Sequence, residues 1–208
     1  MAEVMQLILA SSSPRRRDLL KRAGFEFEIQ PSSIEECPGR GERPEEYARR
    51  AAREKALSVA SVSPGDNLVL GADTVVAVGN DILGKPVGPF DATRMLRTLS
   101  GQTHRVITAV CLVRAPQRLE AWAHETSFVT FCQLSEQEIR EYVATGEPFD
   151  KAGGYAIQGR ASRFVTHIEG CFFNVVGLPV ALVYEILKNI QPPLPSAVPA
   201  SDSAGLRG

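Results

Sequence analysis

Short apolar runs alternate along the chain with segments whose apolar residues recur at helical spacing. Residues 7–10 form an uninterrupted apolar run that is typical of a buried strand. This run leads into Ser13 and Pro14, an N-cap serine followed by a proline at the first helical position. Gly24 is placed to end the resulting helix in a left-handed conformation. The alternation over residues 25–31 then predicts a second strand.

The middle of the chain predicts a helix, two strands and a hairpin arm. A proline opens a helix over residues 44–60, with tyrosine, alanine and leucine on its apolar side. Residues 68–72 and 74–78 are apolar runs, and each predicts a strand. A Gly-Asn turn at residues 79–80 leads into a further arm over residues 81–86.

The alternation continues to the end of the folded region. Ser135 and Glu138 have the spacing of a capping box and mark the start of a helix. Because strands and helices alternate without an internal repeat, we predict an α/β protein with a mixed central sheet and flanking helices. The other expected elements are a helix over 91–101, long strands over 104–115 and 119–134, a strand over 162–177 and a helix over 180–190.

Composition fits one globular domain followed by a tail. The chain has 208 residues, of which 44% are hydrophobic and 23% charged, so it is long enough to bury a sizeable core. From residue 191 onward the sequence is rich in Pro, Ser and Ala, and its few large apolar side chains cannot offset the ordering entropy. We expect one folded domain over residues 1–190 and a disordered tail over residues 191–208.

The charge balance limits the classes of partner. The formal net charge is −1, so there is no global positive field to bind nucleic acid or an anionic membrane, and any anion site must be local. The sequence contains no signal peptide and no apolar run long enough to span a membrane. Its four cysteines are far apart and form no Cys-x-x-Cys pair. We therefore expect a soluble, cytoplasmic protein with free thiols.

Serines and arginines crowd the start of the first helix. A serine-rich turn that includes Ser11 exposes free backbone N–H groups beside the positive end of the helix dipole, which is a geometry that binds anions. Arg15, Arg16 and Arg17 oppose that dipole, because cations stabilise the other end of a helix. Two interpretations are open. The arginines form an ordinary solvated helix face, or the turn binds a phosphate or carboxylate.

Asp73 and Thr74 follow the buried run over residues 68–72. We therefore predict that they lie at the carboxyl end of a strand, where α/β sheets usually bind ligands. In one interpretation, Asp73 holds a divalent metal or orients a water and Thr74 donates a hydrogen bond. In the other, Asp73 satisfies backbone groups in a turn.

Further charged residues have both a functional and an ordinary interpretation. The segment GNDILGK resembles a P-loop, but Pro86 follows where a P-loop needs Ser or Thr, so none is predicted. Lys85 is then either a phosphate contact or a surface lysine. Glu35 or Glu36 is suited to bind a metal or orient a water, and Lys55 to contact a phosphate, although both residue types are common on surfaces.

The segment over residues 146–165 has more glycine and polar residues than a connection requires, among them Asp150, Lys151 and Gln158. The amide of Gln158 is suited to read a base edge, and the alternative is a long structural loop. Neither G-x-S-x-G nor G-x-G-x-x-G occurs in the sequence. The remaining carboxylates and cations are those required for metal-assisted attack on a phosphate.

Seven segments carry a resemblance to a known family. LASSSPRRRDLL, REKA, GADTVV, LGKP, LSGQTH, EPFDKAGGYAIQG and NVVGLP resemble, in order and spacing, the Maf family of nucleoside triphosphate pyrophosphatases, over about residues 5–190. The resemblance implies a two-lobed α/β fold, similar to the inosine triphosphate pyrophosphatases, with a nucleotide cleft over the sheet. It also implies a cytoplasmic, often homodimeric enzyme that uses Mg²⁺ or Mn²⁺ to release pyrophosphate from a nucleoside triphosphate.

The resemblance also assigns site residues one by one. Asp73 matches the proton acceptor that activates the attacking water, and Asp73 and Glu35 are the implied metal ligands. Arg15, Thr74 and Gln158 agree with the branch of the family that acts on dTTP and UTP rather than the branch that prefers 7-methyl-GTP. The other implied catalytic or phosphate-binding positions are Lys85, Ser11, Arg16 and Lys55.

A protein of another class is compatible with the same residues. A nucleotide-sensing or division-regulating binding protein keeps the pocket but turns over little substrate. Such a protein has no need of Asp73 as a base, so Asp73→Asn separates the two hypotheses. An enzyme loses turnover in this variant and keeps binding, whereas the regulatory effect of a binding protein stays unchanged.

Overall fold

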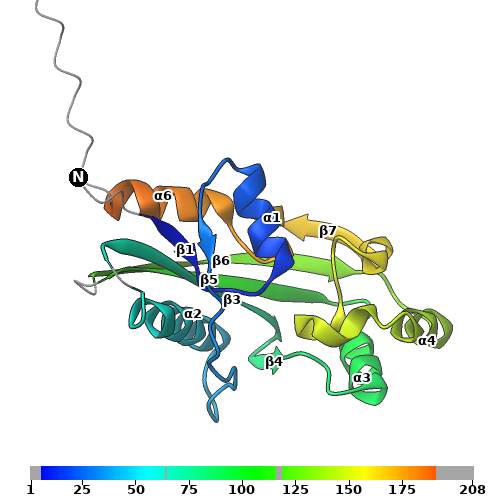
Figure 1. Cartoon of the computed structure of the whole chain (residues 1–208). Coiled ribbons are helices and arrows are strands. Elements are labelled where there is room, and N and C mark those ends of the chain that lie inside the picture. Colours follow the sequence, from blue (N-terminus) through cyan, green and yellow to red (C-terminus); the bar gives the residue numbers. More distant parts are fainter. Residues whose placement is uncertain (1–5, 64, 116–118, 191–208) are drawn as a thin grey trace, which may run out of the picture.

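The computed structural model describes residues 6–63, 65–115 and 119–190, and in them one mixed sheet runs through the molecule (Figure 1). Its strands are β1 (Leu7–Leu9), β2 (Glu28–Ile29), β3 (Asn67–Val78), β4 (Asp81–Leu83), β5 (Thr103–Ala115), β6 (Leu119–Phe131) and β7 (Val165–Glu169). The strand order is β2-β1-β3-β5-β6-β7, and β4 pairs with β3. β1 runs parallel to β2 and β3, and the other pairs are antiparallel. The predicted α/β class with a mixed sheet is therefore confirmed. The expected tail over residues 191–208 lies outside the described residues.

Helices cover both faces of the sheet. They are α1 (Pro14–Arg22), α2 (Pro44–Ala60), α3 (Pro89–Leu99), α4 (Glu136–Ala144), α5 (Phe172–Val176) and α6 (Val180–Ile190). In Figure 1, α2 lies on one face of the sheet and α1 and α6 lie on the other. Helices α3 and α4 gather at one end of the sheet with three short 3₁₀ helices, Glu147–Asp150, Ala152–Gly154 and Arg160–Phe164. Within the described residues, no helix is long and apolar enough to cross a membrane.

The long strand β3 builds a core on both faces, because its side chains alternate between them. Leu70 belongs to the apolar cluster that contains Leu20 of α1, whereas Val69 and Val75 belong to the cluster formed with α2. Small alanines on α2, such as Ala52, let the helix lie close to the strand. Fully burying one leucine or valine contributes about 1.5–3 kcal/mol relative to leaving it exposed, so these two clusters fix where α1 and α2 sit.

Two strands predicted from the sequence are one. The runs over residues 68–72 and 74–78 join in β3, because Asp73 stays in the ladder and pairs with Ala109 of β5. An aspartate is unusual within a strand, and the sequence pattern therefore indicated a break. Long-range pairing with β5 overrides this local preference.

Two other strands are shorter than their patterns predicted. Only Glu28 and Ile29 of the segment 25–31 pair with β1. The prediction of one strand over residues 162–177 is wrong, because β7 ends at Glu169 and Gly170 then turns the chain at a φ of +109°. The apolar residues after this turn form α5 instead. Apolar runs of this length suit a short buried helix as well as a strand.

Gly71 of β3 lies where α2 approaches the sheet most closely. A Cβ atom at this position would be 2.1 Å from the carbonyl oxygen of Ala52 and 2.7 Å from the amide nitrogen of Ala56, both in α2. Backbone atoms do not yield to such a contact, so only glycine allows this packing. The position of α2, and of every side chain it carries toward β3, therefore depends on Gly71.

We expect Gly71→Ala to lower the free energy of unfolding by about 2 kcal/mol or more, because α2 must move away from the sheet. Urea unfolding followed by circular dichroism measures the change. Gly84→Ala is the matched control, since no heavy atom lies within 4 Å of a Cβ at that position. Equal unfolding midpoints for the two variants would contradict this account of the packing.

His104, the second residue of β5, is buried among aromatic rings. Its Nε2 lies 2.8 Å from the hydroxyl of Tyr155, and its ring meets that of Phe131 edge-on with centroids 5.1 Å apart. Burial lowers the pKa of His104 from 6.5 to about 4. The folded protein therefore keeps this imidazole neutral at pH values where the unfolded chain binds a proton.

Because the folded pKa lies below the unfolded one, the stability linked to His104 is complete above about pH 6.5 and is lost as the pH falls toward about 4. We expect wild type to lose about 2 kcal/mol more unfolding free energy than His104→Gln between about pH 7.5 and pH 5. Urea unfolding of both proteins at both pH values measures this, and the comparison within each protein removes the cost of the substitution itself. Equal losses in the two proteins would show that His104 is not the responsible group.

Candidate active site

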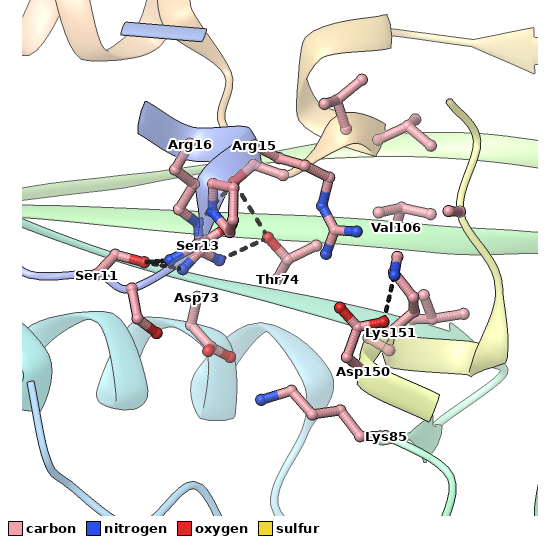
Figure 2. A pocket seen from close by; sticks show the side chains of 18 of the residues that line it. Ser11, Ser13, Arg15, Arg16, Asp73, Thr74, Lys85, Val106, Asp150 and Lys151 are labelled. Atoms are coloured by element: carbon pink, nitrogen blue, oxygen red, sulfur yellow. Dashed lines mark hydrogen bonds and ion pairs between the residues drawn. The ribbon is translucent and has the colours of Figure 1, made fainter. Parts of the chain in front are cut away.

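A cavity of about 740 Å³ lies where β1 ends and β3 continues. The first turn of α1 lines one side and the segment over residues 149–158 lies opposite it (Figure 2). Ser32, Glu36 and Lys85 also line the cavity. The floor is formed by β3 and β5. The lining divides into a charged part and an apolar part. The charged part consists of Arg15, Arg16, Glu36, Lys55, Asp73, Lys85, Asp150 and Lys151, and the apolar part includes Val76, Val106, Phe149, Ala152, Tyr155, Ile157, Val175 and Val176.

Arg16 is a buried cation whose partners are all neutral. Its Nε donates to the carbonyl oxygen of Gly177 at 2.9 Å, Nη1 to Ser11 Oγ at 3.2 Å and Nη2 to Thr74 Oγ1 at 3.0 Å (Figure 2). Among the described residues it forms no ion pair, and its exposed fraction is 8%. Burial lowers the pKa of Arg16, and the charges of Asp73 and Glu36 oppose that effect. A guanidinium nevertheless stays protonated, so an anion in the cavity stabilises it.

The three arginines of this turn have three different surroundings. Arg16 is buried, and Arg15 lines the cavity and extends toward Asp150 and Lys151 on the opposite wall (Figure 2). Arg17 is exposed and forms an ion pair with its neighbour Asp18 at 3.1 Å. The solvated-face interpretation therefore holds for Arg17, whereas Arg15 and Arg16 have the positions expected of an anion site.

A buried lysine joins two carboxylates on the other side of the cavity. Lys55, carried by α2, places Nζ 2.6 Å from Asp73 Oδ1 and 2.7 Å from Glu36 Oε1. Lys85, beyond β4, lies with Nζ 3.3 Å from Glu36 Oε2. Burial alone raises the pKa of Glu36, but Lys55 and Lys85 outweigh it and hold that pKa below its ordinary value. Glu36 is therefore ionised and bridges the two lysines.

Asp73 is almost completely buried, and its environment differs from that of Glu36. Burial raises the pKa of Asp73, and the positive charges of Lys55 and Arg16 only partly oppose this. The sequence predicted Asp73 at the carboxyl end of its own strand, and that prediction is wrong because β3 continues to Val78. The strand that ends here is β1, whose last residue Leu9 pairs with Leu70, so Asp73 still lies just past a parallel strand end.

The structure brings Glu36, and not Glu35, into the cluster. The carboxylate of Glu35 accepts a hydrogen bond from the exposed thiol of Cys37, with the two heavy atoms 3.7 Å apart, and Glu35 does not line the cavity. The two glutamates lie in a connection without helix or strand, where no periodicity indicates which side chain turns inward. The other expected site residues, Ser11, Arg15, Arg16, Lys55, Asp73, Thr74, Lys85 and Gln158, all line the cavity.

The apolar part of the cavity depends on a glycine turn. Gly153 has a φ of +70°, and a Cβ at this position would lie 2.8 Å from Val76 Cγ1 of β3. The turn therefore folds the segment over residues 149–158 against β3 and brings Tyr155 and Ile157 to the cavity wall. The sequence indicated only that this segment has more glycine than a connection requires. It gave no sign that the carbonyl of Gly177 would contact Arg16, since a backbone oxygen leaves no compositional signal.

The carboxylates present fit a divalent cation that is shared with a ligand. No group of three or more His, Cys, Asp or Glu side chains suited to a metal gathers anywhere in the described part of the chain. Asp73 and Glu36 nevertheless meet at Lys55 within the cavity. Mg²⁺ is commonly held by one or two carboxylates together with substrate phosphates and waters, and this donor set meets that requirement.

A mixed α/β sheet with a charged and an apolar subsite at the end of a parallel strand is typical of nucleotide-binding α/β proteins. Comparison with known families gives the particular assignment. The chain belongs to the Maf-like protein family, whose profile matches residues 6–190. The resemblance seen in the seven sequence segments is thereby confirmed.

Close relatives cover nearly the same length. A dTTP/UTP pyrophosphatase of Koribacter versatilis is 50% identical over 184 residues, which cover 88% of this chain and 94% of that protein. A dTTP/UTP pyrophosphatase of Moorella thermoacetica is 51% identical over 182 residues, covering 88% and 93%. Among solved structures, a HAM1 protein from Coxiella burnetii matches with a TM-score of 0.50 and 13% identity, covering 89% of this chain and 100% of that one. This last likeness concerns the fold alone.

The surroundings of Arg16 predict that inorganic pyrophosphate binds in the cavity without any metal. We expect pyrophosphate to raise the thermal unfolding midpoint of wild type, because a ligand that binds only the folded state stabilises it. In Arg16→Met the pyrophosphate affinity should fall by about tenfold or more, since charge-assisted hydrogen bonds are lost. Arg17→Met changes an exposed arginine of the same turn and should bind pyrophosphate as tightly as wild type does. Equal pyrophosphate affinities of the Arg16→Met and Arg17→Met variants would contradict an anion site at Arg16.

Proposed function

We propose that this protein is a nucleoside triphosphate pyrophosphatase that hydrolyses dTTP and UTP to the monophosphate and pyrophosphate. One observation carries this proposal. A single cavity contains Arg16, which is buried and forms no ion pair within the described residues, and a buried Asp73–Lys55 pair. The first feature suits a phosphate chain, and the second suits a positioned base. The names of relatives that are about half identical over almost the whole described chain support the same activity.

The cationic side chains suit the leaving group. Hydrolysis between the α- and β-phosphates releases pyrophosphate, so negative charge accumulates on the β- and γ-phosphate oxygens as the bond breaks. Arg15 and Arg16 on one wall and Lys85 on the other are placed to stabilise that charge. Stabilisation by groups held in position before the reaction requires little reorganisation, and Arg16 is the most firmly held of the three.

Asp73 is the side chain best suited to take the proton from the attacking water. Lys55 Nζ lies 2.6 Å from Asp73 Oδ1, which fixes the orientation of the carboxylate. Burial raises the pKa of Asp73, which makes this carboxylate a stronger base than an exposed aspartate. As the water oxygen bonds to the α-phosphorus, its proton passes to Asp73 and the bond to the bridging oxygen breaks. Lys55 offsets the negative charge of Asp73 before the transfer.

Asp73 and Glu36 are the carboxylates that would hold a divalent cation, Mg²⁺ or Mn²⁺, together with phosphate oxygens. Such a cation supplies charge neutralisation at the attacked phosphate. Glu36 takes the role that the resemblance gave to Glu35, because only Glu36 reaches the cavity.

The apolar part of the cavity suits a nucleobase, and the amide of Gln158 suits a pyrimidine. Gln158 lines the cavity beside Tyr155 and Ile157, and its amide offers both a donor and an acceptor to a base edge. Arg15 and Thr74 line the same cavity. Together with Gln158, these residues favour dTTP and UTP over 7-methyl-GTP. A homodimer in the cytoplasm stays a prediction of the resemblance. The absence of nucleic-acid and membrane partners stays a prediction from the charge balance and the apolar pattern.

Pyrophosphate release from dTTP, UTP, CTP, GTP, 7-methyl-GTP and ITP, with Mg²⁺ or Mn²⁺, tests the proposal. We expect release from dTTP and UTP, and a decrease in kcat of about 10²-fold or more in Asp73→Asn, because an amide cannot accept the proton. The isosteric change should leave nucleotide binding within a few-fold. Asp81→Asn, at the exposed first residue of β4, is the control and should keep full activity.

Other outcomes separate the alternatives. A preference for 7-methyl-GTP would mean that Arg15, Thr74 and Gln158 do not select pyrimidines, while the chemistry at Asp73 stands. Tight nucleotide binding with no pyrophosphate release from any substrate would support the nucleotide-sensing binding protein and contradict the enzyme.

A further inference from the structure

Thr108 is a buried polar residue in the middle of β5, a strand of mostly apolar residues. It lies in β5 between Ile107 and Ala109, and its exposed fraction is zero. It does not line the cavity. In the sheet it pairs directly with Thr74 of β3, which does line the cavity. A hydroxyl buried in such surroundings destabilises the fold unless it is hydrogen-bonded, so its partners indicate what it does.

The hydroxyl of Thr108 continues a chain of hydrogen bonds that begins at Arg16. Arg16 Nη2 donates to Thr74 Oγ1 at 3.0 Å, and Thr74 Oγ1 lies 3.0 Å from Thr108 Oγ1. Thr108 Oγ1 in turn donates to the backbone carbonyl of Asn174 at 3.1 Å. Because Thr108 gives its one proton to Asn174, it can only accept in its contact with Thr74. Thr74 donates there at 3.0 Å in preference to the longer contact with the carbonyl of Gly177 at 3.3 Å. The direction of this chain leaves a lone pair of Thr74 facing the guanidinium.

The same network also fixes the carbonyl of Gly177, to which Arg16 Nε donates. The side-chain amide of Asn174 donates to the carbonyl of Val106 at 2.9 Å and to Ser127 Oγ at 2.8 Å, which fastens α5 to β5 and β6. The residue after α5 is Gly177, whose carbonyl accepts the hydrogen bond from Arg16 Nε. Thr108 thus lies between the two partners, Thr74 and α5, that orient the guanidinium.

Without the hydroxyl of Thr108, Thr74 would have a different set of partners. Among the described residues, the other acceptor within reach of its hydroxyl is the carbonyl of Gly177 at 3.3 Å, which also accepts the hydrogen bond from Arg16. The proton of Thr74 would then turn to that oxygen, which changes the orientation of its lone pairs toward the guanidinium. The carbonyl of Asn174 would keep a partner, because it also accepts from the amide of Gly177 at 3.0 Å. Removing the hydroxyl therefore disturbs the cavity side of the network more than the fold.

We propose that Thr108 is a positioning residue for substrate binding, which acts through Thr74 on Arg16 and does not touch the substrate. This inference rests on the proposed function, because it concerns the affinity of that site for its triphosphate. A hydroxyl that merely fills a gap in the core would affect stability and leave the KM unchanged. A positioning hydroxyl changes the KM, and serine restores its effect.

Three substitutions isolate the hydroxyl. Thr108→Val replaces it by a methyl group at nearly constant volume, and Thr108→Ser keeps it. Thr108→Ala differs from Thr108→Ser by one oxygen atom, so this pair isolates the hydroxyl even if the valine variant does not fold. For each we would measure kcat and KM for dTTP and UTP, and the dissociation constants of dTTP and pyrophosphate in EDTA, where no metal-dependent turnover occurs.

We expect the KM and the two dissociation constants to rise about five- to tenfold in Thr108→Val, and as much in Thr108→Ala relative to Thr108→Ser. The kcat should stay within about twofold, because the hydroxyl does not contact the reacting atoms. Thr108→Ser should match wild type within about twofold. Equal KM values for the serine and alanine variants would overturn the proposal.

A double-mutant cycle tests the route through Thr74. In a Thr74→Val background there is no hydroxyl for Thr108 to accept from, so adding Thr108→Val should change the KM and the dissociation constants no further. Full additivity of the two substitutions would mean that Thr108 does not act through Thr74, and this would also overturn the proposal.

The design separates this inference from the proposed function. If wild type releases no pyrophosphate from any nucleotide, the proposed function fails, and the binding constants in EDTA still test Thr108. If wild type turns over dTTP but the Thr108 variants behave alike, only the positioning role fails. If wild type releases no pyrophosphate and also binds neither dTTP nor pyrophosphate, both are overturned.

Discussion

The contact between the ammonium of Lys55 and the carboxylate of Asp73 is the interaction on which the rest of the site depends. Both side chains are nearly buried, and their charged atoms lie 2.6 Å apart. Two charges inside a protein are strongly destabilising if either loses its partner, so the elements that carry them must hold their spacing. Lys55 belongs to α2 and Asp73 to β3, and Gly71, two residues before Asp73, allows these two elements to meet backbone to backbone. The close packing of α2 on the sheet therefore also sets the distance between the two charged groups in the cavity.

The cavity also explains why a nearly neutral chain has so many arginines in one turn. The formal net charge of the whole chain is −1, but the cavity is lined by five cationic side chains and three carboxylates. The excess of positive charge is therefore local, and it lies beside the positive end of the α1 dipole, where cations alone are unfavourable. Arg16 is held there by neutral oxygens only. A polyanionic ligand neutralises the arginine charges beside the helix dipole. Because these charges are unfavourable in the free protein, they favour binding of such a ligand.

Local sequence signals predicted the elements that carry the site. Proline at the first helical position marked α1 and α2, and an apolar run marked β1, so the turn with Arg16 and the helix with Lys55 were both expected. What the sequence could not reveal depends on contacts between distant segments. The pairing of β3 with β5 keeps Asp73 inside a strand, and the same register sets Thr108 behind Thr74. In the same way, nothing local distinguishes Glu36 from Glu35 in a connection without periodicity.

Two of the carboxylates in the cavity, Asp73 and Glu36, differ in how firmly the fold holds them. Asp73 is fixed on both sides by the ladder of β3 and is buried, so its position is the same whatever the cavity contains. Glu36 belongs to a connection between β2 and α2, and its side chain is about a third exposed. That connection is held at the next residue, where Arg50 of α2 donates to the carbonyl of Cys37 at 3.0 Å and also binds Glu42. Glu36 bridges Lys55 and Lys85, which are the lysines that a phosphate chain would also contact. We therefore expect a triphosphate to compete with Glu36 for Lys85, while Asp73, the proposed base, keeps the position that β3 gives it.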